Sequence, residues 1–308
     1  MFRFIIRRLL QMVLTFIGAT LIIHLLMFAN QTDPVQALFG DRPVTPAARA
    51  WLTERYHLDD PWIVQYGYYM KGLLSGDFGR SLTGREITDM LALSWPVTAK
   101  LALMSIVLVI IFGISGGLIA GLRRNGVFDN VVLFLTLVVI SIPIIVLAPL
   151  AQGFLGIKWK IFPVTAGAHP TFYSLLLPAI VLASLSLAAN LRLTRTSVAE
   201  NLRADYVRTA KAKGLSRSRV VGIHVLRNSL IPVVTSIGVD LGGLMGGAIV
   251  TEGVFNIPGV GYQLFRGIHN EDAPVVVGFT SVLVMIFLLT SLIVDLLYAV
   301  LDPRIRYE

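Results

Sequence analysis

Long hydrophobic stretches alternate with polar stretches along this chain. Each hydrophobic stretch has roughly 20 residues, which is the length an α-helix needs to cross the hydrocarbon core of a bilayer. The pattern therefore predicts six membrane-spanning helices. Their expected ranges are about 9–29, 101–122, 131–154, 175–191, 233–254 and 275–301. The third range contains Pro143 and Pro149, which predict a kink.

Composition supports a membrane protein. Of the 308 residues, 55% are hydrophobic and only 14% are charged, whereas a soluble domain carries about 25% charged residues. The runs lack the alternation of a β-barrel, so we predict an all-α integral membrane protein. Residues 1–29 resemble a signal peptide, but the apolar run continues to Ala29 without a small-residue cleavage site. They are therefore expected to be an N-terminal segment and a retained first helix.

The polar section 30–99 is long enough to form a small folded cap. Thr45-Pro46 and Asp60-Pro61 each open a helix pattern in this section, because proline favours the first turn of a helix. Residues 100–308 are then a core of five further membrane helices, interrupted by the charged loop 203–232.

The distribution of cations predicts the orientation. Six spans place both termini on one side of the membrane. The chain has a net charge of +8, and most of the cations outside the cap lie on that side. The short loops opposite carry only Lys158, Lys160 and Arg266. Because short cytoplasmic loops are rich in Lys and Arg, both termini and the loop 203–232 are expected in the cytoplasm, with the cap outside. The cations on the terminus side are Arg3, Arg7, Arg8, Arg123, Arg124, Arg192, Arg195, Arg203, Arg208, Lys211, Lys213, Arg217, Arg219, Arg227, Arg304 and Arg306.

The basic loop 203–232 is predicted to fold as two helices. Residues 205–213 are good helix formers, and Gly214 is a natural left-handed terminator. Ser216 is expected to cap a second helix over 217–230, with Pro232 in the first turn of the fifth span. Ala210 and Gly214 would leave a bare patch for another backbone. We interpret this elbow as the surface through which a soluble partner drives the protein. The plainer interpretation is that the cations of this loop only set the membrane topology and contact anionic lipid headgroups.

The elbow resembles the EAA loop of ABC-transporter permeases. Gly214 fits the glycine of that motif, Ala210 its second alanine and Leu226 its leucine, while His224 and Arg227 depart from its isoleucine and proline. The oligopeptide/dipeptide branch of the family is more similar. The stretches that carry this likeness are YVRTAKAKGLSRSRV, HVLRNSLIP, YHLDDPWIVQY at 56–66, GDFGRS at 76–81, FNIPGVG at 255–261 and DPRIRY at 302–307.

This resemblance implies a fold, partners and roles. It implies the architecture of a type I ABC importer permease and, from the large loop after the first span, the first of two permease subunits in the bacterial plasma (inner) membrane. Its expected partners are a paralogous permease, two cytoplasmic ATPases, an extracytoplasmic peptide-binding protein and the bilayer, with no nucleic acid. The coupling helix is expected at about 209–216. The residues assigned to ATPase coupling are Arg208, Thr209, Ala210, Lys211, Lys213, Gly214, Leu215 and Ser216.

Acidic residues within the predicted spans are candidates for the transport path. Asp240 and Asp295 would each cost several kcal/mol in lipid unless paired or hydrated. Asp240 is either a path-lining residue or a polar tie between helices, and Asp295 is expected to be structural. Glu252 and the glycine-proline segment after it are interpreted as a gate, with a simple reversing loop as the alternative. Gly246, in the glycine-rich fifth span, is a further candidate.

The sequence predicts that the chain itself is not an enzyme. It has no cysteine, no GxxxxGK[ST] loop for ATP and no HExxH or other metal-binding spacing, so no metal or cofactor is expected. ATP hydrolysis would then occur on partner subunits. Three alternatives to peptide import stay open: nickel, haem or another small solute in the same family, a passive pore, and proton-coupled carriage through Asp240.

Overall fold

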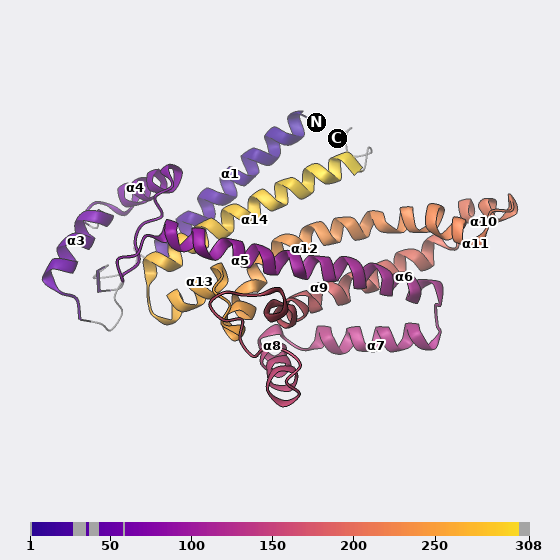
Figure 1. The fold of residues 1–308 in the computed structure, drawn as a ribbon. Helices are drawn as coiled ribbons and strands as arrows, with labels where there is room; N and C mark the ends of the chain where they lie inside the picture. The colour runs from indigo at the N-terminus through magenta and orange to yellow at the C-terminus, as the bar shows by residue number, and fades with distance from the viewer. Residues whose placement is uncertain (1, 27–34, 37–42, 58, 302–308) are drawn as a thin grey trace.

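The computed structural model describes residues 2–26, 35–36, 43–57 and 59–301 (Figure 1). Within these ranges the chain is helical, and its β structure is one isolated bridge between Arg80 and Glu86. The prediction of an all-α protein is therefore confirmed. The quoted stretch 302–307, with Arg304 and Arg306, lies outside the described residues.

Five helices are long and apolar enough to cross a membrane, and a bent pair supplies a sixth span if it counts as one. This agrees with the predicted six. Four are single α-helices and the second combines two α-helices around a π-helical turn. The helices are α1 (Phe2–His24), α5 (Ile87–Leu108) with η2 (Val109–Gly113) and α6 (Ile114–Leu122), α9 (Phe172–Asn201), α12 (Leu226–Phe255) and α14 (Ala273–Leu301).

The third span is broken rather than gently kinked. Helix α7 (Val127–Ser141) and the following helix, α8 (Ile144–Ala151) with η3 (Gln152–Lys158), meet at 107°. Pro143 lacks an amide hydrogen and forces the residue before it to be extended, so Ile142 has φ −102° and ψ 116°. The kink predicted from Pro143 and Pro149 is confirmed and is sharp at Pro143, whereas Pro149 lies inside α8 without interrupting it.

Three helices are longer than their hydrophobic runs suggested. The second span begins at Ile87, so residues 87–99 form its outer turns although they were expected in the cap. Ile87 and Leu91 are buried against α13 (Val260–His269) and α14, which explains why the helix extends outward. Helices α9 and α12 each have 30 residues, a length of about 45 Å, and they carry the elbow beyond the bilayer core.

Close packing of α6 against α9 forms part of the central core. Gly113, Gly117 and Gly121 lie on the face of the second span that contacts α9. A Cβ atom at position 117 would lie 2.5 Å from the Cβ of Thr194 and 2.6 Å from the carbonyl oxygen of Leu191. Glycine is therefore required for the two backbones to approach this closely.

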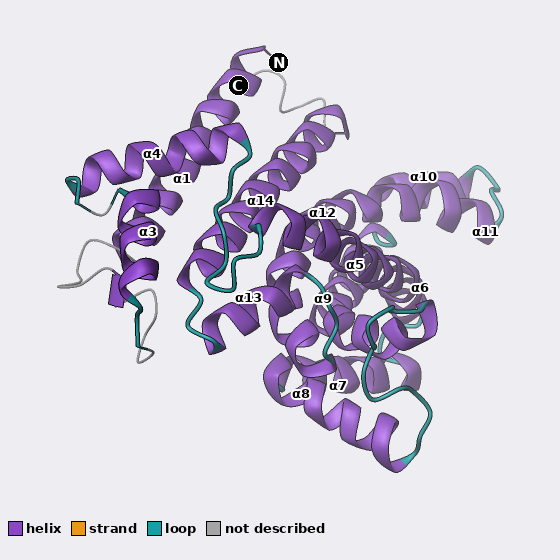
Figure 2. Ribbon diagram, turned by 60° about the vertical axis from the view of Figure 1, so that its left-hand side comes forward, coloured by secondary structure: helices purple, strands orange, loops and turns teal. Residues whose placement is uncertain are grey.

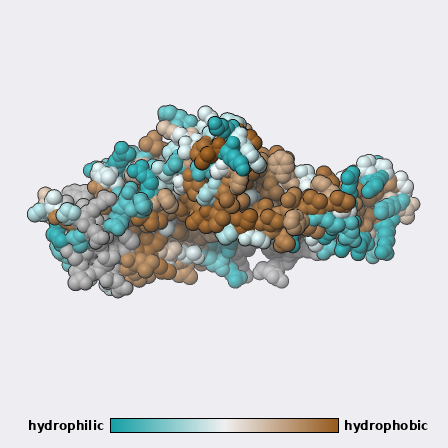
Figure 3. Space-filling model, turned by 90° about the horizontal axis from the view of Figure 1, so that it is seen from below, coloured by the Kyte–Doolittle hydropathy of each residue, from teal (hydrophilic) through white to brown (hydrophobic). Residues whose placement is uncertain are grey.

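The two ends of the molecule are polar and the middle is apolar (Figure 3). Figure 1 places both termini, the α6–α7 connection and the elbow helices α10 (Asp205–Ala212) and α11 (Arg217–Arg219) toward the same end. The cap helices α3 (Pro46–Tyr56) and α4 (Trp62–Ser75) lie toward the opposite end, beside α1 in Figure 2. They begin at Pro46 and directly after Pro61, as the sequence predicted.

Candidate coupling surface and intramembrane polar sites

The elbow joins the ends of α9 and α12 through two short turns. Helix α10 ends at Ala212, and Gly214 has the left-handed φ of +77° that reverses the chain. The amide of Leu215 donates to the carbonyl oxygen of Ala210 at 3.3 Å, which closes this turn. Helix α11 then leads through the π-helix η4 (Val220–Val225) directly into α12. The elbow is thus a projecting hairpin of helices and not a free loop.

An apolar cluster fixes the elbow to the membrane helices. Val207 and Ala210 of α10 are buried against Val198 of α9 and against Val220 and Val225 of η4. These side chains face inward because α10 has its apolar residues on one side and its cations on the other. A force applied to the outer side of α10 therefore reaches α9 and α12 through direct side-chain contacts.

The outer side of α10 and its following turn form what we name the coupling surface. It omits Ala210, which is 5% exposed, so the bare patch expected at Ala210 and Gly214 exists only at Gly214. Leu215 is half-buried against the apolar cluster. The exposed residues of the coupling surface are Arg208, Thr209, Lys211, Ala212, Lys213, Gly214 and Ser216.

Three local expectations for the elbow are corrected. The helical part is Asp205–Ala212, so the expected coupling helix at 209–216 is half helix and half turn. The side chain of Ser216 makes no capping hydrogen bond and instead lies 3.3 Å from the hydroxyl of Ser218. Pro232 lies inside α12 rather than in its first turn, because α12 is continuous with η4 and α11.

Asp240 lies on α12 next to α9, within the membrane-spanning part of the molecule. The amide nitrogen of Asn190 donates a hydrogen bond to its carboxylate. Asp240 is half-buried, whereas Asn190 is fully buried. The geometry thus contains the polar tie that the sequence suggested, and it also leaves one side of the carboxylate uncovered.

Two other acids within the spans are paired with arginines. Arg195 holds the fully buried Asp129 through two hydrogen bonds of 2.9 and 2.7 Å, which join α9 to the start of α7. Arg8 of α1 forms an ion pair with Asp295 of α14 and also donates to Ser291 at 3.2 Å. Asp295 therefore joins two helices, the structural role that was expected for it.

Glu252 lies near the C-terminal end of α12 and is fully buried. Thr98 of α5 donates to its Oε1 at 2.7 Å, and the amide of Tyr262 donates to its Oε2 at 3.0 Å. The same Thr98 hydroxyl accepts the amide of Val260 at 2.8 Å. Glu252 thereby joins α5 and α12 to the first turn of α13, where a carboxylate satisfies amide groups that lack helical partners.

The segment after Glu252 is shaped around its carboxylate. A Cβ atom at position 259 would lie 2.4 Å from Glu252 Oε2, so glycine is required there. Ile257 is fully buried, and its amide donates to the carbonyl oxygen of Glu252 at 2.9 Å. The glycine-proline segment is therefore a packed connection fixed by a buried acid. Its role as a gate stays a prediction.

Removing the Thr98 hydroxyl is expected to loosen this connection. Thr98→Val keeps the shape of the side chain but leaves the Val260 amide and one oxygen of Glu252 without their partner. We expect a loss of about 1–3 kcal/mol in local stability. Hydrogen exchange of residues 256–262 would then be at least several times faster. Thr136→Val, which removes a buried hydroxyl that bonds only locally to the carbonyl oxygen of Leu133, is the control. Unchanged exchange in Thr98→Val would contradict this account of the connection.

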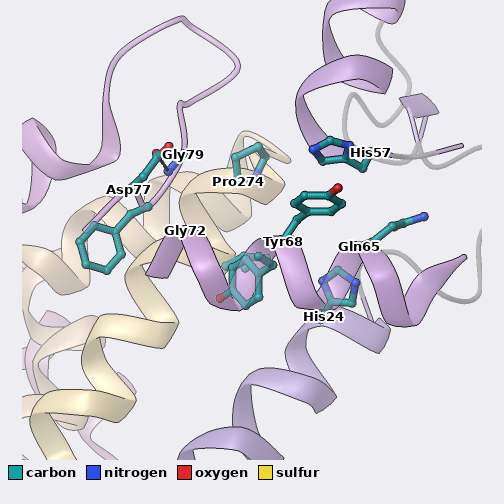
Figure 4. A pocket seen from close by; sticks show the side chains of 11 residues that line it. His24, His57, Gln65, Tyr68, Gly72, Asp77, Gly79 and Pro274 are labelled. Atoms are coloured by element: carbon teal, nitrogen blue, oxygen red, sulfur yellow. Dashed lines mark hydrogen bonds between the residues drawn. The ribbon is translucent and has the colours of Figure 1, made fainter. Parts of the chain in front are cut away.

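A cavity of about 180 Å³ lies between the cap and the outer ends of α1 and α14 (Figure 4). His57 stacks on Tyr68 with their ring centres 3.8 Å apart, and His24 stacks on Tyr69. The hydroxyl of Tyr69 bonds to that of Ser281, and burial raises the pKa of Tyr69 to about 12. The contacts of Tyr69 with His24 and Ser281 attach the cap to α1 and α14, a role that the sequence alone did not reveal.

Gly246 lies within α12 at a position whose surroundings fall outside the described residues. No group of three metal-binding side chains is found in the part of the chain that the structure describes. The sequence analysis missed the Asp129–Arg195 pair and Thr98, because neither lies in a motif. The spacing of Gly113, Gly117 and Gly121, four residues apart, was the available signal for the α6–α9 contact.

The chain matches two known family descriptions. Residues 113–307 match the family described as "Binding-protein-dependent transport system inner membrane component". Residues 1–102 match its N-terminal counterpart, a binding-protein-dependent transport system membrane component. Residues 103–112 of the second span separate the two matches, and the match over 113–307 covers the elbow, Asp240 and Glu252.

Several curated proteins are similar over their whole length. The dipeptide transport system permease protein DppB of Alkalihalophilus pseudofirmus is 35% identical, with all of both chains covered. DppB of Bacillus subtilis is 37% identical over 99% of this chain and 98% of its own. The oligopeptide transport system permease protein OppB of Salmonella typhimurium is 34% identical, again over the whole of both chains.

Proposed function

This chain belongs to the family of binding-protein-dependent transport system inner membrane components, and we propose that it is the permease subunit of an ATP-driven importer of dipeptides or oligopeptides. The relatives described above are named for dipeptide and oligopeptide transport, which favours peptides over nickel or haem. The observation that carries the proposal is the projecting basic elbow. The chain has no nucleotide-binding loop, so ATP-driven import through it requires a partner ATPase, and the elbow packs against α9 and η4, where it could transmit that partner's motion.

The coupling surface is proposed to bind a cytoplasmic ATPase. Arg208, Lys211 and Lys213 are exposed there, while the opposite side of α10 is buried against α9 and η4. A partner that displaces α10 is expected to displace α9 and α12 with it, because Val207 of α10 packs directly against the valines of α9 and η4. The remaining partners are a second permease and an extracytoplasmic binding protein that delivers the peptide.

The orientation follows from the distribution of charge. We propose that both termini and the elbow lie in the cytoplasm, with α3, α4 and α13 outside. The cations near the termini, the α6–α7 connection and the elbow are those that the sequence assigned to one side, and Figure 1 places these segments toward one end. Short loops rich in Arg and Lys remain on the cytoplasmic side of a membrane.

The transport path is proposed to run along the exposed face that α9 and α12 share beside Asp240. Exposed side chains of α1 and α7 are large and apolar, such as Leu14 and Phe134, as lipid contact requires. The face beside Asp240 is smaller and more polar, so it suits water or a polar solute. We name it the polar face, and its members are Ser186, Ala189 and Arg192 from α9 and Pro232, Ser236, Val239, Asp240 and Gly243 from α12.

Charge reversal on the coupling surface tests the proposed function. We expect Lys211→Glu with Lys213→Glu to reduce both peptide uptake and peptide-stimulated ATP hydrolysis at least tenfold, since about 1.4 kcal/mol of lost binding suffices. The measurement uses the complete complex in proteoliposomes. Lys158→Glu with Lys160→Glu reverses two exposed charges far from the elbow and should leave both activities unchanged. If the elbow variant inserts normally and both activities persist, the elbow is not the coupling surface.

A further inference from the structure

Asp240 differs from the other intramembrane aspartates in having no cationic partner. Asp129 is paired with Arg195, and Asp295 is paired with Arg8. Among the residues that the structure describes, no Lys, Arg or His forms an ion pair with Asp240. Its hydrogen-bond partner is the neutral side chain of Asn190. An acidic side chain within a membrane span is normally paired or hydrated, and the described residues supply no opposite charge for the half-buried Asp240.

The position of Asp240 along the membrane normal increases its need for a partner. Gly113 lies beside Asn190, since a Cβ atom added at position 113 would lie 3.5 Å from the Cβ of Asn190, and the nine-residue α6 separates Gly113 from the α6–α7 connection. Nine helical residues span about 14 Å, roughly half of a hydrocarbon core of about 30 Å. Asn190 and the carboxylate it holds therefore lie near the middle of the membrane. Snorkelling to a headgroup is not available to a side chain as short as aspartate.

The surroundings of Asp240 fix the carboxylate without neutralising it. Asn190 is fully buried, its amide nitrogen also donates to the carbonyl oxygen of Ser186, and its amide oxygen accepts no hydrogen bond from the described residues. This arrangement orients Asp240 from the protein side. On the polar face, Ser236 and Gly243 lie about one helical turn before and after Asp240, and a Cβ atom added at Gly243 would meet nothing within 4 Å.

We propose that Asp240 is a specificity-determining residue that contacts a primary ammonium group of the transported solute near the middle of the membrane. The inference rests on the proposed function, because it takes the polar face as the wall of the path. An ammonium group supplies the missing positive charge and three hydrogen-bond donors. Every peptide with a free amino terminus carries one, so a single carboxylate serves solutes with different side chains.

A thiol at position 236 provides the test, and this chain contains no other cysteine. Ser236 precedes Asp240 by one helical turn, so Ser236→Cys changes one atom close to the carboxylate. In the assembled complex we expect this thiol to react with water-soluble methanethiosulfonates. Leu135→Cys, on the apolar side of α7, is the control and should stay unreactive. A thiol at 236 that is as unreactive as the one at 135 overturns the inference.

The charge preference of the reagents reports on Asp240. The cationic trimethylammonioethyl reagent should react faster than the anionic sulfonatoethyl reagent, and Asp240→Asn should reduce that rate ratio at least fivefold. Asp240→Glu keeps the charge and should retain the preference. An unchanged ratio in an assembled Asp240→Asn complex contradicts the inference. If the Asp240→Asn variant does not assemble, the inference is tested instead by comparing protection by two peptides in the protein that retains Asp240.

Peptide protection identifies the ligand. With the binding protein omitted, we expect trialanine to slow modification of the thiol at 236, and N-acetyl-trialanine, which lacks the ammonium group, to protect at least fivefold less. Equal protection by the two peptides overturns the role of Asp240 even if transport is intact. A complex that fails to take up any peptide with ATP contradicts the proposed function instead, so the two failures are distinguishable.

Discussion

Gly117→Ala should prevent stable folding of the permease, although alanine is the better helix former. The added Cβ would lie 2.5 Å from the Cβ of Thr194 and 2.6 Å from the Leu191 carbonyl oxygen, distances that real atoms do not adopt. The Leu191 backbone cannot rotate away as a flexible side chain could, so α6 and α9 must separate. Because this contact is part of the central core, we expect a cost of about 3 kcal/mol, at the upper end for an overpacked core. Unfolding of the purified protein in mixed SDS micelles measures it.

The matched control is Gly18→Ala in α1. A Cβ atom at Gly18 meets nothing within 4 Å, so only the helix propensity changes there. Alanine in an exposed helix gains about 0.5–1 kcal/mol over glycine, and Gly18→Ala should be neutral or slightly stabilising. Equal effects of the two substitutions would show that α6 and α9 do not pack as closely as described.

Much of the fold was predictable because lipid imposes simple rules. A helix that crosses the bilayer needs roughly 20 apolar residues, so the spans could be located from hydrophobicity alone. Proline also acted locally: Pro46 and Pro61 open the cap helices, and Pro143 breaks the third span. These features depend on the residue and its immediate neighbours. They need no knowledge of which helices meet.

The ends of the helices were not predictable, because tertiary contacts determine them. Residues 87–99 look like part of a polar cap, yet Ile87 and Leu91 are buried against α13 and α14 and the helix starts there. In the elbow, Ser216 has the right identity for a cap but makes no capping bond, and Pro232 continues a helix that it was expected to begin.

For charged residues too, the sequence showed which residues matter but not which residues they contact. Sequence reasoning singled out Asp240 and Glu252 because acids inside spans are costly, but it could not supply their partners. Asn190 lies 50 residues from Asp240, and Thr98 lies 154 residues from Glu252. Ala210 was assigned to the coupling surface by motif, and only its burial among the valines shows that it faces the other way. The sequence thus identified some of the residue types in a site, whereas the contacts between them required the structure.

Asp129→Asn should strongly destabilise the half of the molecule that carries the elbow. Both oxygens of Asp129 accept hydrogen bonds from Arg195, and the amide of Asn125 donates to one of them at 2.8 Å. Asparagine cannot accept all three bonds, and it leaves the guanidinium of Arg195, whose side chain is 16% exposed, without its counter-charge. Breaking one side of a buried ion pair costs about 3–5 kcal/mol. We expect that loss in an SDS unfolding titration, with α7 the first helix to become accessible to protease.

A double variant that removes both charges tests whether the loss of stability comes from an unpaired charge. Asp129→Leu with Arg195→Met removes both charges, and apolar replacements of buried ion pairs are often neutral or stabilising. We therefore expect the double variant to be more stable than Asp129→Asn alone. Arg80→Gln breaks an ion pair with Glu86 in which both side chains are about half exposed, and it should cost less than about 1 kcal/mol. If Asp129→Asn cost no more than Arg80→Gln, the α7–α9 contact could not depend on this pair. The membrane helices would then be held together near the elbow by apolar packing such as that around Gly117.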